Sequence, residues 1–416
     1  MKKYDVIVLG GGFAVVAAAI ASAREGAKTL LVEKGNALGG AAVNCLVNPF
    51  MPYSTKIEGV LTELSQGIFT EINKRLEAKN AIVNRHFLEE ELKFVLNDMV
   101  LEAGVELLFH AYLCGVKKEN GKLQSISVAT KCGPVELEAN TFVDTSGDAQ
   151  LAYLAGCPTV LGREPDHLCQ PMTLCFRVGN VDREKFLAGR PAFQMAYAEA
   201  KKAGTIKNPR EDVLVFKFLV PNVLHFNTTR IVKKNPTDPF DVTAAEIEAR
   251  RQVEEIYEWL KQNAEGLENS FLMSTASEIG VRESRMIVGD YVLTERDCRA
   301  FTKFEDGIAA CNYDIDIHNP EGTGTSHYYF KDGEYYTIPY RSLIPRGVSN
   351  LLVAGRCISS DHGAQASYRI MPTVCSLGEA AGVAAGMACR AGVGVREINV
   401  EALKENLKNY GAFLGI

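Results

Sequence analysis

The sequence lacks the features of several common protein classes. It has 45 lysines and arginines against 51 aspartates and glutamates, so it has no basic excess suited to nucleic acid or to an anionic membrane surface. Its 11 cysteines form no C-x-x-C pair, so neither a zinc site nor a redox dithiol is indicated. The longest uncharged apolar runs, 13–23 and 380–389, are shorter than the roughly 20 residues of a membrane span. We therefore expect a cytoplasmic protein with no metal, no nucleic-acid partner and no membrane insertion.

The first 33 residues contain a strand–helix–strand pattern. An apolar run at 4–9 ends at Gly10, and an alanine-rich helix follows Gly12. Gly10 permits a tight turn, while Gly12 lets the backbone approach a diphosphate at the helix N-terminus. Glu33 ends the second strand, at 29–32, where a carboxylate can bind ribose hydroxyls and would repel a 2′-phosphate. This segment predicts a dinucleotide site, although Val15 stands where such loops usually carry a third glycine.

Apolar periodicity predicts a first region of alternating strands and helices and a second, mixed region from about residue 160. A turn at Asn120-Gly121 indicates an antiparallel meander within the first region. The buried-strand pattern returns near residue 351, so the last part of the chain is expected to rejoin the first region. We expect further helices at 56–79, 89–102, 243–263 (capped by Asp241 or Thr243) and from 372, and strands at 105–110, 112–117, 123–130, 135–138, 141–144, 173–178, 213–220, 222–231, 271–277 and 351–354.

Three further features favour FAD over NAD as the dinucleotide. A glycine pair after the second strand lets backbone lie against a second phosphate or a flavin ring. A Thr-Ser-Gly-Asp segment follows a late strand, and a small-residue helix begins near residue 372, where its N-terminus can stabilise negative charge on a reduced flavin. The residues predicted to contact the cofactor are Gly10, Gly12, Phe13, Ala14, Glu33, Lys34, Gly39, Gly40, Ala41, Ser146, Gly147, Gly355, Arg356, Pro372 and Thr373.

With these motifs in place, the sequence resembles the FAD-dependent oxidoreductases of the glutathione-reductase-like superfamily. More narrowly, it is similar to the bacterial FAD-dependent oxidoreductase family, kin to the flavoprotein subunits of fumarate reductase. That family usually has proline and glycine where this chain has Phe13 and Val15. The matching segments are VIVLGGGFAVVAAAIASAREGAKTLLVEKGNALGG, TFVDTSGDAQLAYLAG, IGVRESRMIVGDYVLTERD and IPYRSLIPRGVSNLLVAGRCISSDHGAQASYRIMPTVCSLGEAAG.

The resemblance implies an α/β fold: a Rossmann-like FAD-binding domain, with a β-meander inserted in its parallel sheet, plus a mixed α+β substrate domain. The FAD-binding domain would comprise residues 1–160 and 345–416, and the substrate domain residues 161–344. No second glycine fingerprint occurs between 160 and 345, and no redox cysteine pair is present. These absences argue against a disulfide reductase fed by NAD(P)H, and the flavin is expected to exchange electrons with its substrate and with a separate, unidentified donor or acceptor.

Flavin chemistry on a C–H bond needs an acid or base, and an anionic substrate needs cations. The segment 281–287 supplies Arg282, Glu283 and Arg285, and strand alternation would place Glu283 and Arg285 on one face. His362 and Arg369 precede the C-terminal helix and are expected near the flavin ring. These five residues are our predicted catalytic set. His318 and Tyr340 are weaker candidates, and Cys45 is expected to be a buried thiol rather than a covalent flavin attachment point.

We predict an FAD-dependent oxidoreductase that transfers hydride between flavin N5 and a small polar or anionic organic substrate. One alternative is a flavin-binding electron-transfer or sensing subunit with little turnover of its own. A second alternative is an NAD-dependent dehydrogenase without flavin.

Overall fold

The computed structural model describes residues 2–164 and 166–415. Its main sheet is seven-stranded, in the order β7-β2-β1-β10-β9-β8 with β21 also paired to β10. The strands β7, β2, β1, β10 and β21 are parallel. The helices α1 (Phe13–Arg24) and α11 (Met371–Ala391) pack on one face of the sheet, and apolar residues of β8, β9 and the short helix α5 (Gln150–Leu154) pack with β1 and β2 in a second core. Their bounds are β1 Lys2–Leu9, β2 Thr29–Val32, β7 Glu106–Leu108, β8 Tyr112–Glu119, β9 Lys122–Thr130, β10 Gly133–Asp144 and β21 Leu351–Val353.

The expected meander is present, but its last strand differs from the prediction. The runs 135–138 and 141–144, predicted as two strands, form the single strand β10. Its first half pairs antiparallel with β9, and its end pairs parallel with β21, so one long strand joins the meander to the parallel sheet. Its other edge pairs with β1 from Leu137 to Asp144, which spans the point where the break was predicted. The α/β class and the Rossmann-like arrangement are confirmed.

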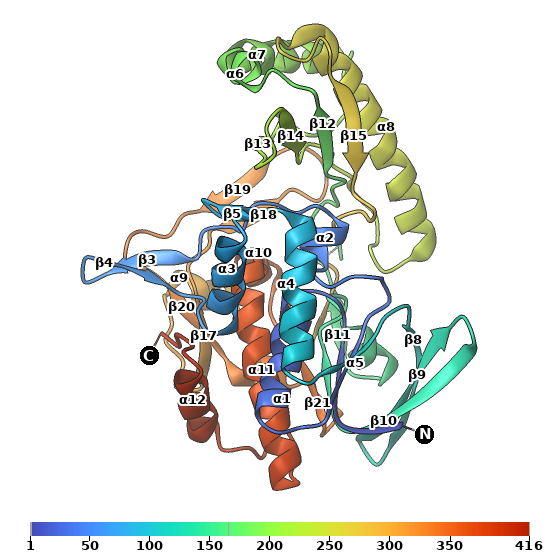
Figure 1. Cartoon of the computed structure of the whole chain (residues 1–416), viewed down its shortest axis with the longest axis vertical. Helices are drawn as coiled ribbons and strands as arrows, with labels where there is room; N and C mark the ends of the chain where they lie inside the picture. The colour runs from blue at the N-terminus through green and yellow to red at the C-terminus, as the bar shows by residue number, and fades with distance from the viewer. Residues whose placement is uncertain (1, 165, 416) are drawn as a thin grey trace.

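Two parallel helices, α1 (Phe13–Arg24) and α11 (Met371–Ala391), lie side by side on the sheet (Figure 1). A Cβ added at Gly378 would lie 2.1 Å from the carbonyl oxygen of Ala14, and one at Gly382 would lie 2.2 Å from that of Ala18. Only glycine permits such backbone contact. The glycines that the sequence places in the C-terminal helix therefore bring the N-termini of both helices to the same side of the molecule.

The remaining elements of this body surround the sheet and the helix pair. The helix predicted at 56–79 is wrong in its first half, because Gly59 (φ +83°) turns a β-hairpin there, and the helix α3 begins only at Ile68. These elements are α2 Ala41–Asn44, β3 Ser54–Ile57, β4 Val60–Glu63, α3 Ile68–Ala78, β5 Ile82–Val83, β6 His86–Phe87, α4 Glu89–Glu102, α5 Gln150–Leu154, β11 Thr159–Leu161, β16 Arg285–Ile287, α9 Glu295–Arg299, β17 Gly307–Cys311, β18 Ile315–His318, β19 Thr325–Tyr328, β20 Tyr336–Pro339, η1 Tyr340–Leu343, α10 His362–Tyr368 and α12 Val400–Asn409.

A smaller lobe stands at the top of Figure 1, built on an antiparallel sheet of order β13-β14-β12-β15. Its long helix begins at Pro239 rather than near Thr243, because Asp238 accepts hydrogen bonds from the amides of Phe240 and Asp241 and caps it. Its strands are shorter than predicted. The bounds are β12 Phe176–Gly179, α6 Arg183–Ala188, α7 Arg190–Lys202, β13 Val215–Lys217, β14 Val223–Phe226, α8 Pro239–Asn263 and β15 Phe271–Thr275.

The lobe has an apolar core of its own, formed by buried residues between Met172 and Ile279. A larger core lies around α1 and α11 and takes residues from both ends of the chain. The division into domains at residues 160 and 344 stays a prediction. Within the described ranges no single helix is long and apolar enough to cross a membrane; α10 and α11 reach that length and composition only together, and they are bent by 97° at their junction.

Stability should fall in mild acid because of His225, which is buried in β14. Neither ring nitrogen has a hydrogen-bond partner among the described residues. Burial, and secondarily the charge of Arg177, lowers the pKa of His225 to about 3. An unfolded chain takes up this proton near pH 6.5, so between roughly pH 6.5 and 3 the unfolded state binds more protons and stability drops as pH falls.

Replacing this imidazole tests the effect. His225→Phe should reduce the pH slope of the unfolding free energy in that range by about 1.4 kcal/mol per pH unit, measured by urea denaturation. His110→Asn, which removes an exposed imidazole, serves as the control and should leave the slope unchanged. An unaltered slope in His225→Phe would show that His225 titrates normally.

Candidate active site

The loop after β1 forms a narrow glycine cradle. A Cβ added at Gly10, whose φ is +125°, would lie 2.5 Å from the carbonyl oxygen of Thr145 in the neighbouring loop. A Cβ at Gly40 would lie 2.7 Å from the Cα of Gly12, so the second glycine pair packs directly on the first loop. Open space adjoins Gly12, which begins α1 without a side-chain cap. The uncapped amides and the free space suit a diphosphate.

Glu33 lies against this cradle. Its side chain is 5% exposed, and its Oε1 accepts a hydrogen bond of 2.7 Å from the Gly35 amide. A Cβ at Gly11 would lie 2.6 Å from the Glu33 carboxyl carbon, so the loop and the carboxylate are in close contact. Burial raises the pKa of Glu33. The carboxylate is thus placed beside the diphosphate position, where hydroxyl donors of an adenosine ribose would offset its desolvation.

A second part of the cradle is formed by the loops after β10 and β21. The guanidinium of Arg356 lies against Gly147 and makes a 2.7 Å ion pair with Asp148. Its Nε is buried and has no hydrogen-bond partner in the described part of the chain. An unsatisfied cationic donor beside an open glycine loop fits the anionic or polyhydroxy middle of a dinucleotide.

The other residues predicted to contact the cofactor lie in or next to the loops that form this cradle. Ala41 begins the short helix α2 on top of Gly12, and Pro372 and Thr373 lie in the first turn of α11, which has no side-chain cap. Ser146 Oγ accepts a hydrogen bond of 3.0 Å from the Gln150 amide. Phe13 and Ala14 are buried under the loop. Lys34 pairs with Glu278 at 3.2 Å, Gly39 donates its amide to the Gly11 carbonyl, and Gly355 has a φ of +95°.

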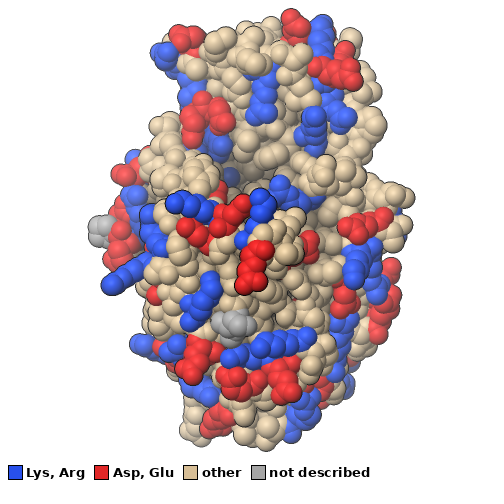
Figure 2. Space-filling model, turned by 90° about the vertical axis from the view of Figure 1, so that its left-hand side faces the viewer, with Lys and Arg blue, Asp and Glu red and all other residues tan. Residues whose placement is uncertain are grey.

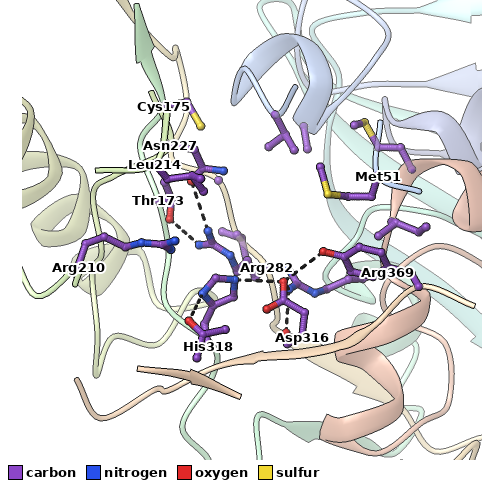
Figure 3. Close-up of a pocket in the computed structure, with 18 of the residues that line it drawn as sticks. Met51, Thr173, Cys175, Arg210, Leu214, Asn227, Arg282, Asp316, His318 and Arg369 are labelled. Carbon is purple, nitrogen blue, oxygen red and sulfur yellow. Dashed lines mark hydrogen bonds and ion pairs between the residues drawn. The ribbon is translucent and has the colours of Figure 1, made fainter. Parts of the chain in front are cut away.

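A cavity of about 550 Å³ adjoins this cradle, between the smaller lobe and the body. It is visible as a recess in Figure 2, with charges of both signs around its rim. Ala41, Arg356 and Met371 line it on the cradle side, which makes it continuous with the cofactor residues. Val47, Met51, Leu214, Phe216, Val281 and Ile370 supply apolar walls, and Figure 3 shows a polar side formed by Arg210, Arg282, Asp316, His318 and Arg369.

Arg282 is the central cation of this cavity. It donates hydrogen bonds to the carbonyl oxygen of Pro171 and to Thr173 Oγ1, and more weakly, at 3.5 Å, to Asn227 Oδ1. No carboxylate of residues 2–164 or 166–415 lies within ion-pair distance of it. Burial and then the charges of Arg369 and Arg210 lower the pKa of Arg282 to about 9, which leaves it protonated at neutral pH. An unpaired, half-buried cation in a cavity wall suits the binding of an anion.

Asp316 lies opposite, on the hairpin of β18 and β19. Its Oδ2 is 3.3 Å from His318 Nε2, 3.3 Å from the Tyr313 hydroxyl and 3.5 Å from Arg369 Nη2. Burial alone would raise its pKa, but the hydrogen bond from His318 and the positive charge of Arg369 hold the pKa of Asp316 well below its usual value. Asp316 is therefore a permanent carboxylate rather than an acid.

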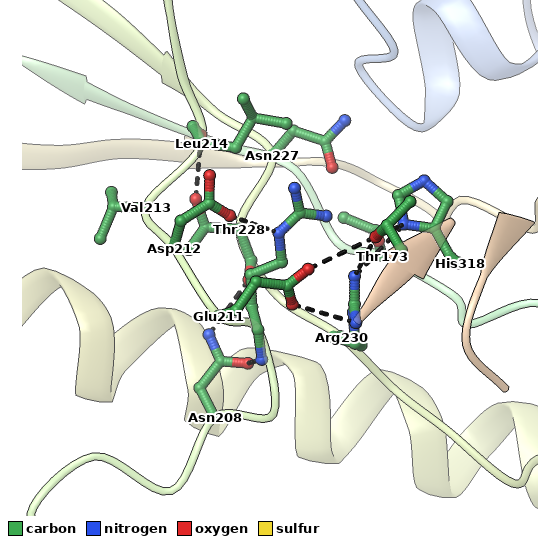
Figure 4. A network of polar contacts seen from close by, with 12 residues as sticks. Thr173, Asn208, Glu211, Asp212, Val213, Leu214, Asn227, Thr228, Arg230 and His318 are labelled. Atoms are coloured by element: carbon green, nitrogen blue, oxygen red, sulfur yellow. Dashed lines mark hydrogen bonds and ion pairs between the residues drawn. The ribbon is translucent and has the colours of Figure 1, made fainter. Parts of the chain in front are cut away.

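Arg230 fixes the position and tautomer of His318 (Figure 4). It is 1% exposed, pairs with Glu211 at 3.1 Å, and donates to the carbonyl oxygens of Gly322 and Gly324. Its Nη2 is 3.3 Å from His318 Nδ1. Because arginine can only donate, Nδ1 is the acceptor and the ring proton is on Nε2, facing Asp316. Burial lowers the pKa of His318 to about 3, so the imidazole is neutral.

Two of the five predicted catalytic residues, Arg282 and Arg369, line the cavity, and the other three do not. Glu283 is fully buried and binds His362 Nδ1 at 2.7 Å and the Gln170 amide at 2.8 Å. Arg285 donates to the carbonyl oxygen of Asp148 and lies 4.2 Å from the centre of the Tyr153 ring. The expectation that Glu283 and Arg285 share a face is wrong, because a strand begins only at Arg285. Catalytic roles for Glu283, Arg285 and His362 stay predictions.

The two weaker candidates, His318 and Tyr340, lie in different parts of the structure. His318 lines the cavity, whereas Tyr340 is buried and its hydroxyl donates to the Val395 carbonyl at 2.8 Å. Cys45 is 7% exposed, and burial raises the pKa of its thiol to about 12, as suits an inert side chain. The sequence analysis missed Asp316, although the alternation Asp314, Asp316, His318 with isoleucines between was a visible signal of one polar strand face. It also missed Arg210, Tyr313 and His327, which line the same cavity.

A glycine cradle at the carboxyl end of a parallel sheet, a buried carboxylate beside it and an adjoining cavity are typical of a dinucleotide-binding protein. The profile of the family described as FAD dependent oxidoreductase matches residues 5–407. The chain belongs to this family, and FAD is its cofactor. The orphaned Arg356 Nε and the open space at Gly12 fit that assignment. No group of three metal-ligating side chains occurs in the described ranges.

More distant relatives agree with the class. The soluble pyridine nucleotide transhydrogenase of Mycobacterium bovis is 28% identical over 185 residues, 39% of this chain and 39% of that protein. The glutathione reductase of Yarrowia lipolytica is 27% identical over 164 residues, 38% of this chain and 34% of that protein. The chain thus matches well under half the length of these relatives. A geranylgeranyl bacteriochlorophyll reductase-like protein from Thermoplasma acidophilum has the same fold, with a TM-score of 0.53 at 15% identity, covering 98% of this chain and 84% of that one. Kinship with fumarate reductase stays a prediction.

Proposed function

We propose that this FAD-dependent oxidoreductase exchanges hydride between flavin N5 and a small organic anion that binds in the cavity between the lobe and the body. The unpaired cation Arg282 carries this proposal, because a half-buried positive charge in the wall of a cavity beside the cofactor cradle favours an anionic ligand. Bound FAD supplies a two-electron acceptor or donor. The cofactor would be held by the glycine loops, Glu33 and Arg356.

The cavity residues would have distinct tasks. Arg282 would bind the anion with the Nη atom that makes only a 3.5 Å contact in the free protein. Arg369, held by the carbonyl oxygen of Asp316 at 3.2 Å, would orient the substrate against the start of α11. The apolar walls, including Met51 and Phe216, would exclude water and accept the carbon skeleton. Electrons would then pass between the flavin and a separate donor or acceptor, which we infer from the absence of a second nucleotide fingerprint in the sequence.

Anaerobic spectroscopy tests this function. The oxidised holoprotein is mixed with a library of small organic acids, and the photoreduced holoprotein with unsaturated and keto acids, while the flavin absorption is followed. We expect at least one acid to change the redox state of the flavin, and the matched uncharged amide to fail because it cannot pair with Arg282. A protein loaded with FAD whose flavin no acid reduces or reoxidises would contradict the proposal and favour the electron-transfer or sensing subunit.

A further inference from the structure

The cavity contains a second unsatisfied group besides Arg282. Asp316 Oδ2 receives all the hydrogen bonds of that carboxylate, from His318 and Tyr313. Asp316 Oδ1 is buried and has no hydrogen-bond partner within the described residues. His327 Nδ1 lies 3.7 Å from it, beyond hydrogen-bond distance. A carboxylate oxygen that is buried without a donor costs free energy, so its position in a cavity wall indicates that a ligand supplies the donor.

The charges around the cavity indicate the net charge of the ligand that would supply this donor. Each carboxylate is matched by one arginine: Asp316 by Arg369, Asp212 by Arg210, Glu211 by Arg230 and Asp148 by Arg356. Of the four described arginines that line the cavity, Arg210, Arg356 and Arg369 have these carboxylate partners, and Arg282 has none. A ligand with one net negative charge therefore balances the cavity. An amino acid zwitterion leaves one positive charge unmatched, and a dicarboxylate brings one negative charge too many.

We propose that the substrate is a hydroxy monocarboxylate whose carboxylate pairs with Arg282 and whose hydroxyl group donates a hydrogen bond to Asp316 Oδ1. This inference rests on the proposed function and makes it more specific. The hydroxyl is a neutral donor, so it satisfies Oδ1 without disturbing the pairing of Asp316 with Arg369. The apolar residues Val47, Met51 and Leu214 line the rest of the space and would contact an aliphatic chain.

The arrangement also assigns a positioning role to Arg230. It lies behind His318 and does not line the cavity. Because Arg230 donates a hydrogen bond to Nδ1 of His318, the ring proton stays on Nε2. Nε2 then donates to Asp316 Oδ2, which leaves Oδ1 free for the ligand. The recognition of the hydroxyl thus depends on a network that extends to Glu211 in the lobe.

Binding to the photoreduced holoprotein under anaerobic conditions, measured by titration calorimetry, tests this inference without turnover, because a reduced flavin cannot take hydride from a hydroxy acid. The probes are hexanoate, 2-hydroxyhexanoate, 3-hydroxyhexanoate, norleucine and butylsuccinate. At least one hydroxyhexanoate should bind on the order of tenfold to a hundredfold more tightly than hexanoate, because it adds one hydrogen bond to a buried charge. Norleucine and butylsuccinate should bind more weakly than the preferred hydroxy acid.

The variant Asp316→Asn should remove most of this preference while hexanoate still binds. Asp314→Asn makes the same change two residues away, outside the cavity lining, and should retain the preference. Far-UV circular dichroism and flavin content confirm that each variant is folded and loaded. If hexanoate binds but neither hydroxy acid binds better, or if Asp316→Asn keeps the preference, the assignment of the hydroxyl is overturned and the anion site stands. Tightest binding by norleucine or butylsuccinate overturns it as well. If no carboxylate binds, the proposed function fails with it.

Discussion

Arg282→Gln is expected to weaken the binding of organic anions by about thirtyfold or more. The loss corresponds to one charge-assisted hydrogen-bonded pair in a buried site, worth roughly 2 to 3 kcal/mol. The glutamine can still donate to the carbonyl oxygen of Pro171 and to Thr173, so the local structure should persist. Titration of the holoprotein with hexanoate, read by the flavin spectrum, measures the change.

Although Arg282→Gln should weaken anion binding, it should not lower the thermal stability of the protein. Burial and the neighbouring Arg369 and Arg210 disfavour the charged form of Arg282, as its lowered pKa shows. Removing the charge should therefore leave the thermal midpoint unchanged or raise it, even as binding is lost. Arg285→Gln is the matched control, since Arg285 contacts Asp148 and Tyr153 outside the cavity. Equal affinity in Arg282→Gln and the wild type would show that the anion binds elsewhere.

The cofactor half of the site could be predicted from sequence because its signals are local. The glycines at 10 and 12, the acidic residue at 33 and the spacing between them all lie within one strand–helix–strand unit. The glycines of the C-terminal helix were also visible, although their contacts with Ala14 and Ala18 join segments more than 360 residues apart in the chain. Resemblance to a family connected these distant pieces, since periodicity alone cannot.

The substrate half could be predicted only in part, because its contacts are long-range. Glu283 and His362 were both identified as polar residues of interest, but their 2.7 Å contact spans 79 positions and turns each away from the cavity. Asp316 lies on a short hairpin, where the sequence shows one polar strand face but does not show that this face lies against the cavity. The arginine cluster was found because it is dense in sequence, yet only the fold shows that Arg282 lines the cavity and Arg285 does not.

The second large effect is expected at the ribose position, where Glu33→Arg should leave the purified protein nearly free of flavin. Glu33 is 5% exposed and in contact with Gly11, so a longer, cationic side chain both displaces the loop and removes the acceptor of the ribose hydroxyls. Each effect is worth a few kcal/mol, and together they should weaken FAD binding by at least about a hundredfold. The ratio of flavin to protein absorbance after gel filtration, and titration of the apoprotein with FAD, measure the loss.

Two controls separate the cofactor effect from misfolding. Glu278→Arg is the same charge reversal at the surface partner of Lys34, and it should keep its flavin because its side chain is 43% exposed and outside the cradle. Glu33→Gln keeps an acceptor oxygen for the Gly35 amide and should retain an intermediate fraction of FAD. A folded Glu33→Arg protein with full flavin content would refute the ribose contact that we predict for Glu33.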